Sequence, residues 1–166
     1  MIILGIDPGL AIVGWGVIES NRGVQRPIAF GSIKTPAHTL IESRLLMIEK
    51  DLTQIIEKYK PDEMAIEELF FNTNITTGIA VAEARGVILC TAHKFGVKIS
   101  EYTPLQVKQA VVGYGKAEKK QVIAMVTSIL RLPSPPKPDD TADAVAIALC
   151  HAQCAGSGIG QFYNKR

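Results

Sequence analysis

Residues 2–19 have the sequence IILGIDPGLAIVGWGVIE, in which a short turn joins two apolar runs. The first run, residues 2–6, has the length and continuous hydrophobic character of a buried strand. The tripeptide DPG at residues 7–9 is typical of a turn, because proline presets φ and glycine permits a tight reversal. Residues 14–19 then return as a second strand. The segment therefore predicts an antiparallel hairpin at the start of a sheet.

The rest of the chain alternates between helical and extended patterns. Apolar residues recur with helical spacing at positions 41, 45, 48, 52, 55, 56 and 59. The order βββαβαβααα favours an α/β fold in which helices cover both faces of a mixed five-stranded sheet. The elements predicted after the hairpin are strands at 25–35, 64–66 and 97–102, helices at 41–59, 77–95 and 117–130, a helix capped by Thr103 with Pro104 at its first position, a proline-rich loop at 133–138, and a last helix from 139 or 140 to about 153.

Length and composition bound the class of protein. At 166 residues with 47% hydrophobic content, the chain suits one compact domain, which we expect over residues 1–155 with a flexible tail at 156–166. The first residues have no basic leader pattern, and no apolar stretch is long enough to span a bilayer. These features predict a cytoplasmic protein that does not enter a membrane.

Three cysteines argue against a disulfide framework, because the number is odd and no CxxC pair is present. Cys150, His151 and Cys154 form a possible metal-binding cluster, since positions 150 and 154 share a helix face. The surrounding segment is rich in alanine, and small buried cysteines are ordinary there. We therefore interpret these cysteines as core residues, with a zinc site as the alternative.

Positive charge is concentrated in one segment. Residues 103–138 contain six Lys or Arg and one Glu, whereas the remainder of the chain is net −3. A solvated helix face explains such a run on composition alone. A nucleic-acid surface is the other interpretation, and it needs support from other residues.

Four carboxylates lie where predicted elements end or begin. Asp7 follows the first strand, Glu67 ends the strand at 64–66, and Asp140 and Asp143 lie three residues apart in the first turn of the last helix. Each has an ordinary explanation, because acidic residues are common in turns, in loops and near helix N-termini. Asp143 fits that explanation least well, since it lies past the usual cap among alanine, valine and isoleucine. An unpaired carboxylate is costly there, so a cation is a good candidate for its partner.

Carboxylate oxygens are the ligands of hard cations such as Mg²⁺, which usually retains several waters. Carboxylates from separate elements can hold two ions around a scissile phosphate. One ion lowers the pKa of an attacking water, and the other stabilises the leaving 3′ oxygen. Four such side chains therefore suit a site that holds Mg²⁺, or Mn²⁺ as a substitute, around a phosphodiester, as a metal-dependent nuclease requires.

Short motifs carry a more specific likeness. They are ILGIDPGL at 3–10, GWGV at 14–17, AIEE at 65–68, FFN at 70–72, ARGV at 84–87, YTP at 102–104, VKQ at 107–109, glycines 113 and 115, AEK at 117–119 and DTADA at 140–144. Together they strongly resemble the RuvC-type Holliday-junction resolvases, a family of crossover junction endodeoxyribonucleases. The likeness runs nearly collinearly from residue 2 to about residue 152, so it covers most of the chain.

The resemblance implies an RNase H-like three-layer fold and a homodimer that resolves four-way DNA junctions by two symmetric nicks during recombination and repair. It also implies work with the branch-migration proteins RuvA and RuvB. Phe70 matches an aromatic residue that contacts bases near the crossover. Lys116 and Lys120 either extend the DNA-binding surface or belong to a solvated helix face. The implied catalytic residues are Asp7, Glu67, Asp140 and Asp143, which hold two ions, with Lys108 and Lys119, which also bind DNA.

The chain departs from the family pattern at a few positions. Val13 stands where a hydroxyl residue is expected, and Glu83 where glutamine is frequent. Asp139 precedes Asp140, so the last motif could be shifted by one residue; the face shared with Asp143 favours Asp140 as the ligand and Asp139 as a cap. Phe71 is as readily a core residue as a DNA contact.

Other classes of protein share parts of the pattern. RuvX-like nucleases have the Asp-Pro-Gly opening and would act on RNA, but the block at 107–119 argues against them. Actin-like ATPases need a second phosphate loop and a larger body than 166 residues allow. A non-catalytic junction-binding protein is disfavoured because all four carboxylates are present.

For the homodimer, the helix at 77–95 is the candidate interface, with an ordinary core helix as the alternative. Its small and apolar residues are Ile79, Ala80, Ala82, Ala84, Gly86 and Val87.

Overall fold

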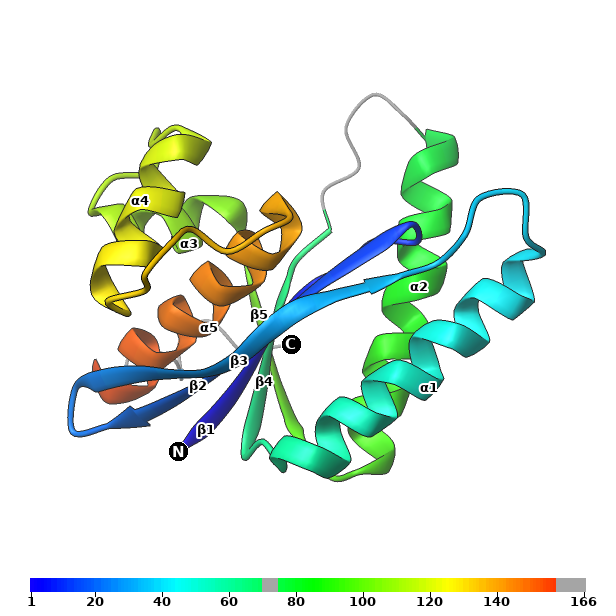
Figure 1. The fold of residues 1–166 in the computed structure, drawn as a ribbon, viewed down its shortest axis with the longest axis horizontal. Helices are drawn as coiled ribbons and strands as arrows, with labels where there is room; N and C mark the ends of the chain where they lie inside the picture. Colours follow the sequence, from blue (N-terminus) through cyan, green and yellow to red (C-terminus); the bar gives the residue numbers. More distant parts are fainter. Residues whose placement is uncertain (70–74, 158–166) are drawn as a thin grey trace.

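A mixed sheet lies at the centre of the protein (Figure 1). This computed structural model describes residues 1–69 and 75–157, and within them the strands are β1 (Ile2–Asp7), β2 (Ile12–Asn21), β3 (Val24–Lys34), β4 (Glu63–Glu67) and β5 (Lys98–Tyr102). They lie in the order β3-β2-β1-β4-β5. The pairs β1–β2 and β2–β3 are antiparallel, whereas β1–β4 and β4–β5 are parallel. The carboxyl ends of β1, β4 and β5 therefore meet at one edge of the sheet.

Helices cover both faces of this sheet, which gives three layers. In the described part of the chain they are α1 (Ile41–Tyr59), α2 (Ile75–Lys94), α3 (Pro104–Val112), α4 (Lys119–Ile129) and α5 (Asp139–Ser157). α1 and α2 pack together over one face, and α5 crosses β1 and β2 on the other face with α3 and α4 against it (Figure 1). None of the described helices is long and apolar enough to cross a membrane.

Alternation of side chains along the strands builds one core on each face. Leu4, Ile6 and Ile66 are fully buried in the core beneath α1 and α2. Ile3 and Ala65, their neighbours in sequence, are fully buried in the core beneath α5. Burial of each large aliphatic side chain stabilises the fold by roughly 1.5–3 kcal/mol relative to its exposure. The central strands are thus apolar on both sides, which explains their continuous hydrophobic sequence.

Two glycines allow α5 to approach the sheet closely. A Cβ atom on Gly5 would collide with the backbone carbonyl of Ala144, and one on Gly14 would collide with the backbone carbonyl of Asp140. The Thr141 hydroxyl adds a hydrogen bond, which it donates to the carbonyl of Gly31 in β3 at 3.0 Å. The first turn of α5 is therefore held against the sheet at the end where β1 finishes.

The predicted fold class and element order are confirmed. The helix at 41–59 agrees at both ends, and Thr103 caps α3 as predicted, because its hydroxyl accepts a hydrogen bond from the backbone N–H of Gln106 at 3.2 Å. α5 extends to Ser157, beyond the predicted end near residue 153. Residues 158–166 lie outside the described residues, so the division into a domain and a tail stays a prediction.

Candidate active site

Asp7 and Glu67 lie side by side at one edge of the sheet. Asp7 is the last residue of β1 and Glu67 the last residue of β4, and the two parallel strands pair Ile6 with Ile66 just before them. Because Ile6 and Ile66 face α1 and α2, the alternation of the strands turns both carboxylates toward α5. The two carboxyl groups lie within hydrogen-bonding reach of each other when one of them is protonated.

α5 brings two more carboxylates to the same place. Asp7 pairs with Gly14 across the β1–β2 hairpin, and the backbone of Asp140 lies directly on Gly14. Asp140 and Asp143 are half-buried in the first turns of α5, whereas Asp139 is exposed. The structure therefore brings together all four carboxylates that the sequence singled out.

Burial and mutual repulsion change how the carboxylates titrate. Burial, and then the negative charges of Glu67, Asp143 and Asp140, raise the pKa of Asp7 to about 8. Burial and the charge of Asp143 also raise the pKa of Glu67. A cation bound between the carboxylates would stabilise their ionised forms and so lower the raised pKa values of Asp7 and Glu67.

Lys119 supplies a positive charge to the cluster. It is the first residue of α4, and its Nζ lies 2.8 Å from Oδ2 of Asp143 and 3.5 Å from Oδ2 of Asp139. Burial lowers the pKa of Lys119, but the hydrogen bond and charge of Asp143 outweigh burial and leave that pKa raised. Lys108, half-buried on α3, lies close enough for its charge to lower the pKa of Glu67. Lys119 therefore contacts the carboxylates directly, whereas Lys108 acts on Glu67 through its charge.

The other predicted DNA-binding residues lie farther out or cannot be placed. Lys116 is exposed. Lys120 is exposed too and forms an ion pair with Glu118 at 2.9 Å. Phe70 and Phe71 fall outside the described residues, so their predicted roles stay predictions.

The chemistry of the donor set fits a hard divalent cation. No three His, Cys, Asp or Glu side chains are already arranged as a metal site within residues 1–69 and 75–157. The Lys119 ammonium instead forms an ion pair with Oδ2 of Asp143. Carboxylate oxygens of four acidic residues, drawn from three elements, nevertheless match what Mg²⁺ prefers, and their repulsion favours a bound positive charge.

Sequence reasoning missed a buried polar network around His151. The His151 ring contacts the Tyr102 hydroxyl through Nδ1 at 2.7 Å and Oε2 of Glu63 through Nε2 at 2.7 Å. Both ring nitrogens therefore have protein partners, which disfavours the zinc alternative at Cys150, His151 and Cys154. Periodicity alone could not find this network, because its members are distant in sequence.

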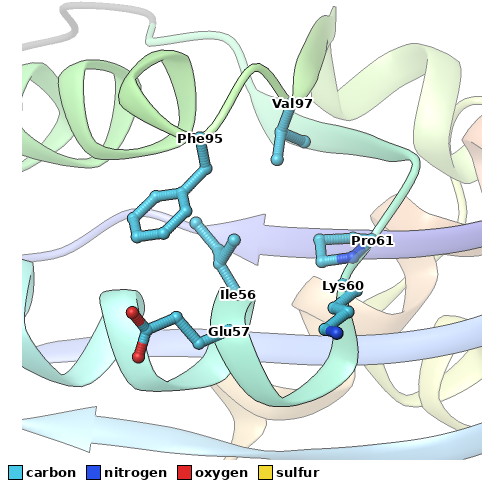
Figure 2. Close-up of a pocket in the computed structure, with 6 residues that line it drawn as sticks. All are labelled: Ile56, Glu57, Lys60, Pro61, Phe95 and Val97. Atoms are coloured by element: carbon cyan, nitrogen blue, oxygen red, sulfur yellow. The ribbon is translucent and has the colours of Figure 1, made fainter.

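A pocket of about 400 Å³ lies at the opposite end of the sheet (Figure 2). Pro61 and Val97 line it just before the amino ends of β4 and β5, and Phe95 projects into it from the end of α2. One carboxylate, Glu57, and one ammonium, Lys60, are also present. The pocket is thus remote from the clustered carboxylates.

Comparison with known proteins agrees with this geometry. Fold and site define an RNase H-like α/β enzyme with clustered carboxylates, and the family model described as "Crossover junction endodeoxyribonuclease RuvC" matches residues 3–151. The chain belongs to this family of endodeoxyribonucleases. The protein of that name from Clostridioides difficile is 55% identical over 152 residues, which cover 92% of this chain and 90% of that protein. The one from Halothermothrix orenii is 56% identical over 151 residues, which cover 91% and 92%.

Solved structures agree with the fold. The structure of Thermus thermophilus RuvC has a TM-score of 0.88 and 35% identity, and the match covers 95% of this chain and 97% of that one. The structure titled "T. thermophilus RuvC in complex with Holliday junction substrate" has a TM-score of 0.90 and 36% identity, covering 95% and 96%. The yeast mitochondrial Holliday junction resolvase Ydc2, at 13% identity and a TM-score of 0.69, shares the fold.

Proposed function

We propose that this protein resolves four-way DNA junctions by hydrolysing two phosphodiester bonds in a metal-dependent reaction. Membership of the RuvC family supports the nuclease activity, and the Thermus thermophilus relative was solved with a Holliday junction. The observation that carries the proposal is the meeting of Asp7, Glu67, Asp140 and Asp143 at one edge of the sheet. Such a cluster suits metal-assisted phosphodiester hydrolysis and has no need for a nucleophilic side chain.

The carboxylates have one role in this proposal and the lysines another. Asp7, Glu67, Asp140 and Asp143 hold two Mg²⁺ ions, or Mn²⁺ in their place. When bound, the ions supply an activated water and neutralise charge on the leaving oxygen. Lys119 and Lys108 stabilise charge that develops on the phosphate; Lys119 pairs with Asp143, and the charge of Lys108 acts on Glu67.

DNA binding uses the basic side chains of the α3–α4 region. Lys116 and Lys120 are exposed there, and they attract the phosphate backbone without contacting the reacting group. Phe70 is proposed to contact bases near the crossover. This role rests on the family motif alone, because Phe70 falls outside the described residues.

A homodimer provides the two active sites that paired nicks require. One chain has carboxylates for one site, and a two-fold axis matches the approximate symmetry of a junction. α2 is the proposed interface: Ile79 is 54% exposed and Gly86 has open space beside it, whereas Ala84 is buried in the core. Sedimentation at micromolar concentration tests this, and a strictly monomeric species that still makes paired nicks would refute it.

The cellular setting follows from the substrate. Since the chain belongs to the RuvC family and the proposed substrate is recombining DNA, we place the enzyme in the cytoplasm, acting with RuvA and RuvB. Co-sedimentation with RuvA and RuvB on a junction tests the partnership. If the enzyme associated with neither RuvA nor RuvB in the presence of junction DNA, the partnership would be removed from the proposal.

The decisive experiment compares three substrates in Mg²⁺: a synthetic four-way DNA junction, a linear DNA duplex and an RNA–DNA hybrid. We expect paired nicks confined to the junction, and none with Asp7→Asn. Lys94→Gln is the matched control, because Lys94 lies at the far end of α2 in an exposed ion pair with Glu49 at 3.4 Å. Preference for the hybrid or for RNA would instead favour a RuvX-like activity.

A further inference from the structure

Arg85 contacts two neighbouring strands directly behind the carboxylate cluster. Its Nε lies 3.4 Å from the backbone carbonyl oxygen of Glu67, and its Nη2 lies 2.7 Å from Oε2 of Glu101 on β5. The second contact is an ion pair rather than a well-directed hydrogen bond. Only 13% of the Arg85 side chain is exposed. One side chain of α2 thus joins the ends of β4 and β5.

The contacts come from the face of the sheet opposite the carboxylates. Glu101 pairs in register with Ile66, whose side chain is buried beneath α1 and α2. The side chain of Glu67 points the other way, toward α5. Arg85 therefore reaches the backbone of Glu67 from behind and does not touch the position where a phosphate would bind.

Glu67 lies at the very end of its strand, so the position of its carboxylate depends on how that strand end is held. It is the last residue of β4, and the backbone N–H of Glu68 makes the next contact, to the carbonyl of Tyr102 at 2.9 Å. A shift of this strand end would carry the Glu67 carboxylate with it. Metal and phosphate chemistry tolerates little such displacement, on the order of 0.5 Å.

Arginine suits this place better than lysine. Its planar guanidinium can contact two acceptors in a fixed relative geometry, and it stays charged when mostly buried. In Arg85 the two acceptors are the backbone of the strand that carries Glu67 and the carboxylate of the neighbouring strand. The side chain therefore ties both strand ends to α2.

We propose that Arg85 is a positioning residue for the nuclease reaction: it anchors the carboxyl end of β4 to α2 and Glu101, and so holds the Glu67 carboxylate in place for metal binding. This inference rests on the proposed function for its activity readout. Its metal-binding readout is independent of any substrate.

The test uses Arg85→Gln, Arg85→Lys and Glu101→Gln in the full chain, with Lys94→Gln as the matched control. Mn²⁺ affinity is measured without DNA by titration calorimetry, and single-turnover cleavage and junction affinity are measured separately. We expect Arg85→Gln to weaken Mn²⁺ binding and turnover by roughly tenfold to a hundredfold, as is usual when support of a metal ligand is lost. Junction affinity should change less than twofold, because Arg85 faces away from the DNA side.

The conservative variants separate positioning from a general need for folding. Arg85→Lys keeps the charge beside Glu101 but loses the planar guanidinium that contacts two acceptors. Its Mn²⁺ affinity should therefore be higher than that of Arg85→Gln and lower than that of wild type. The Mn²⁺ affinity of Glu101→Gln should lie between those of wild type and Arg85→Gln. Thermal unfolding is followed for each variant. If Arg85→Gln does not fold, Arg85→Lys and Glu101→Gln carry the comparison.

Two results would overturn the proposal. One is unchanged Mn²⁺ affinity in the folded Arg85 variants. The other is a loss of junction affinity as large as the loss of turnover, which would make Arg85 a DNA-binding residue. If wild-type protein bound Mn²⁺ and Arg85→Gln did not, yet neither cleaved junctions, the proposed substrate would be wrong while the role of Arg85 stood.

Discussion

Nζ of Lys119 lies 2.8 Å from Oδ2 of Asp143, so an ammonium group occupies a carboxylate oxygen that a metal ion would use. Lys119 also reaches Asp139 at 3.5 Å, and about half of its side chain is exposed. The ion pair neutralises part of a cluster in which Asp7 and Glu67 already resist ionisation. A metal ion that binds Oδ2 of Asp143 has to displace Lys119 or share the oxygen with it, and one that binds Oδ1 still meets the nearby ammonium charge.

Replacing Lys119 with alanine should therefore have two opposite effects. Mn²⁺ should bind the protein alone more tightly, because no ammonium competes for Asp143 or repels the ion. Single-turnover cleavage should nevertheless fall by roughly tenfold to a thousandfold, because charge developing on the phosphate loses its partner. Calorimetry and rapid quench of a labelled junction measure the two effects.

Lys120→Ala is the matched control for Lys119→Ala. The Lys120 ammonium pairs with Glu118 at 2.9 Å, and 81% of the Lys120 side chain is exposed. We expect it to change junction affinity and to lower the salt slope by roughly one unit or less, with turnover nearly unchanged. Equal losses of affinity alone in both variants would reduce Lys119 to an ordinary phosphate contact.

Asp140 and Asp139 should differ sharply when each is changed to asparagine. The charge of Asp140 acts directly on Asp7, whereas Asp139 is exposed and pairs with Lys119. Asp140→Asn should abolish cleavage and leave junction binding intact or improved, because removing negative charge beside a phosphate does not weaken attraction. Asp139→Asn should keep most of the activity. If Asp139→Asn abolished cleavage and Asp140→Asn kept it, Asp139 would be the metal ligand in place of Asp140.

Asp7 should make the metal-free protein less stable as pH rises. Its pKa is raised from 3.8 to about 8 in the folded protein, so between these values the native state keeps a proton that the unfolded state has lost. Stability falls with pH wherever the native state binds more protons. The free energy of unfolding in chelator should therefore decrease from about pH 4 to about pH 8.

Asp7→Asn provides the comparison, because an amide has the same shape and no proton to lose. This variant should lose most of that pH dependence and should be more stable than wild type at pH 8, although it cannot cleave. Denaturant titrations at several pH values measure the difference. Parallel stability curves for wild type and Asp7→Asn would show that Asp7 ionises normally in the folded protein.

The fold could be predicted from sequence because its main signals are local. The continuous apolar run before Asp7 and the helical spacing at 41–59 each depend on neighbours within one element. The edge of the sheet where the site forms follows as well, since Asp7 and Glu67 both end strands and parallel strands end together. The helix bounds were less accurate at residues 77 and 153, because helices can extend or fray by a turn without changing their buried face.

What the sequence could not supply are contacts between distant elements. Arg85 stands 16 residues before its partner Glu101, and nothing in either segment indicates that they meet. His151 gives the opposite lesson, since its spacing to the cysteines suggested a ligand cluster, while its actual partners are Tyr102 and Glu63. The raised pKa of Asp7 likewise depends on burial and on three charges that only folding brings together.

The identity of the metal ion should separate binding from turnover. Mg²⁺ and Mn²⁺ should both support cleavage, because the carboxylate cluster offers hard oxygen ligands. Ca²⁺ should permit junction binding with little cleavage, since its larger and looser coordination misplaces the attacking water. Cleavage and gel-shift assays in each ion measure this. Full activity in excess chelator would contradict a metal-dependent mechanism.

Gly14→Ala should test whether the close approach of α5 matters for the site. A Cβ at residue 14 would collide with the backbone carbonyl of Asp140, so the first turn of α5 has to move outward and take Asp140 away from Asp7. Overpacking of this kind typically costs about 1–3 kcal/mol of stability. We expect folded Gly14→Ala to lose Mn²⁺ affinity and cleavage together, measured by calorimetry and single-turnover kinetics. Wild-type Mn²⁺ affinity in that variant would mean that Asp140 is positioned independently of the β1–β2 hairpin.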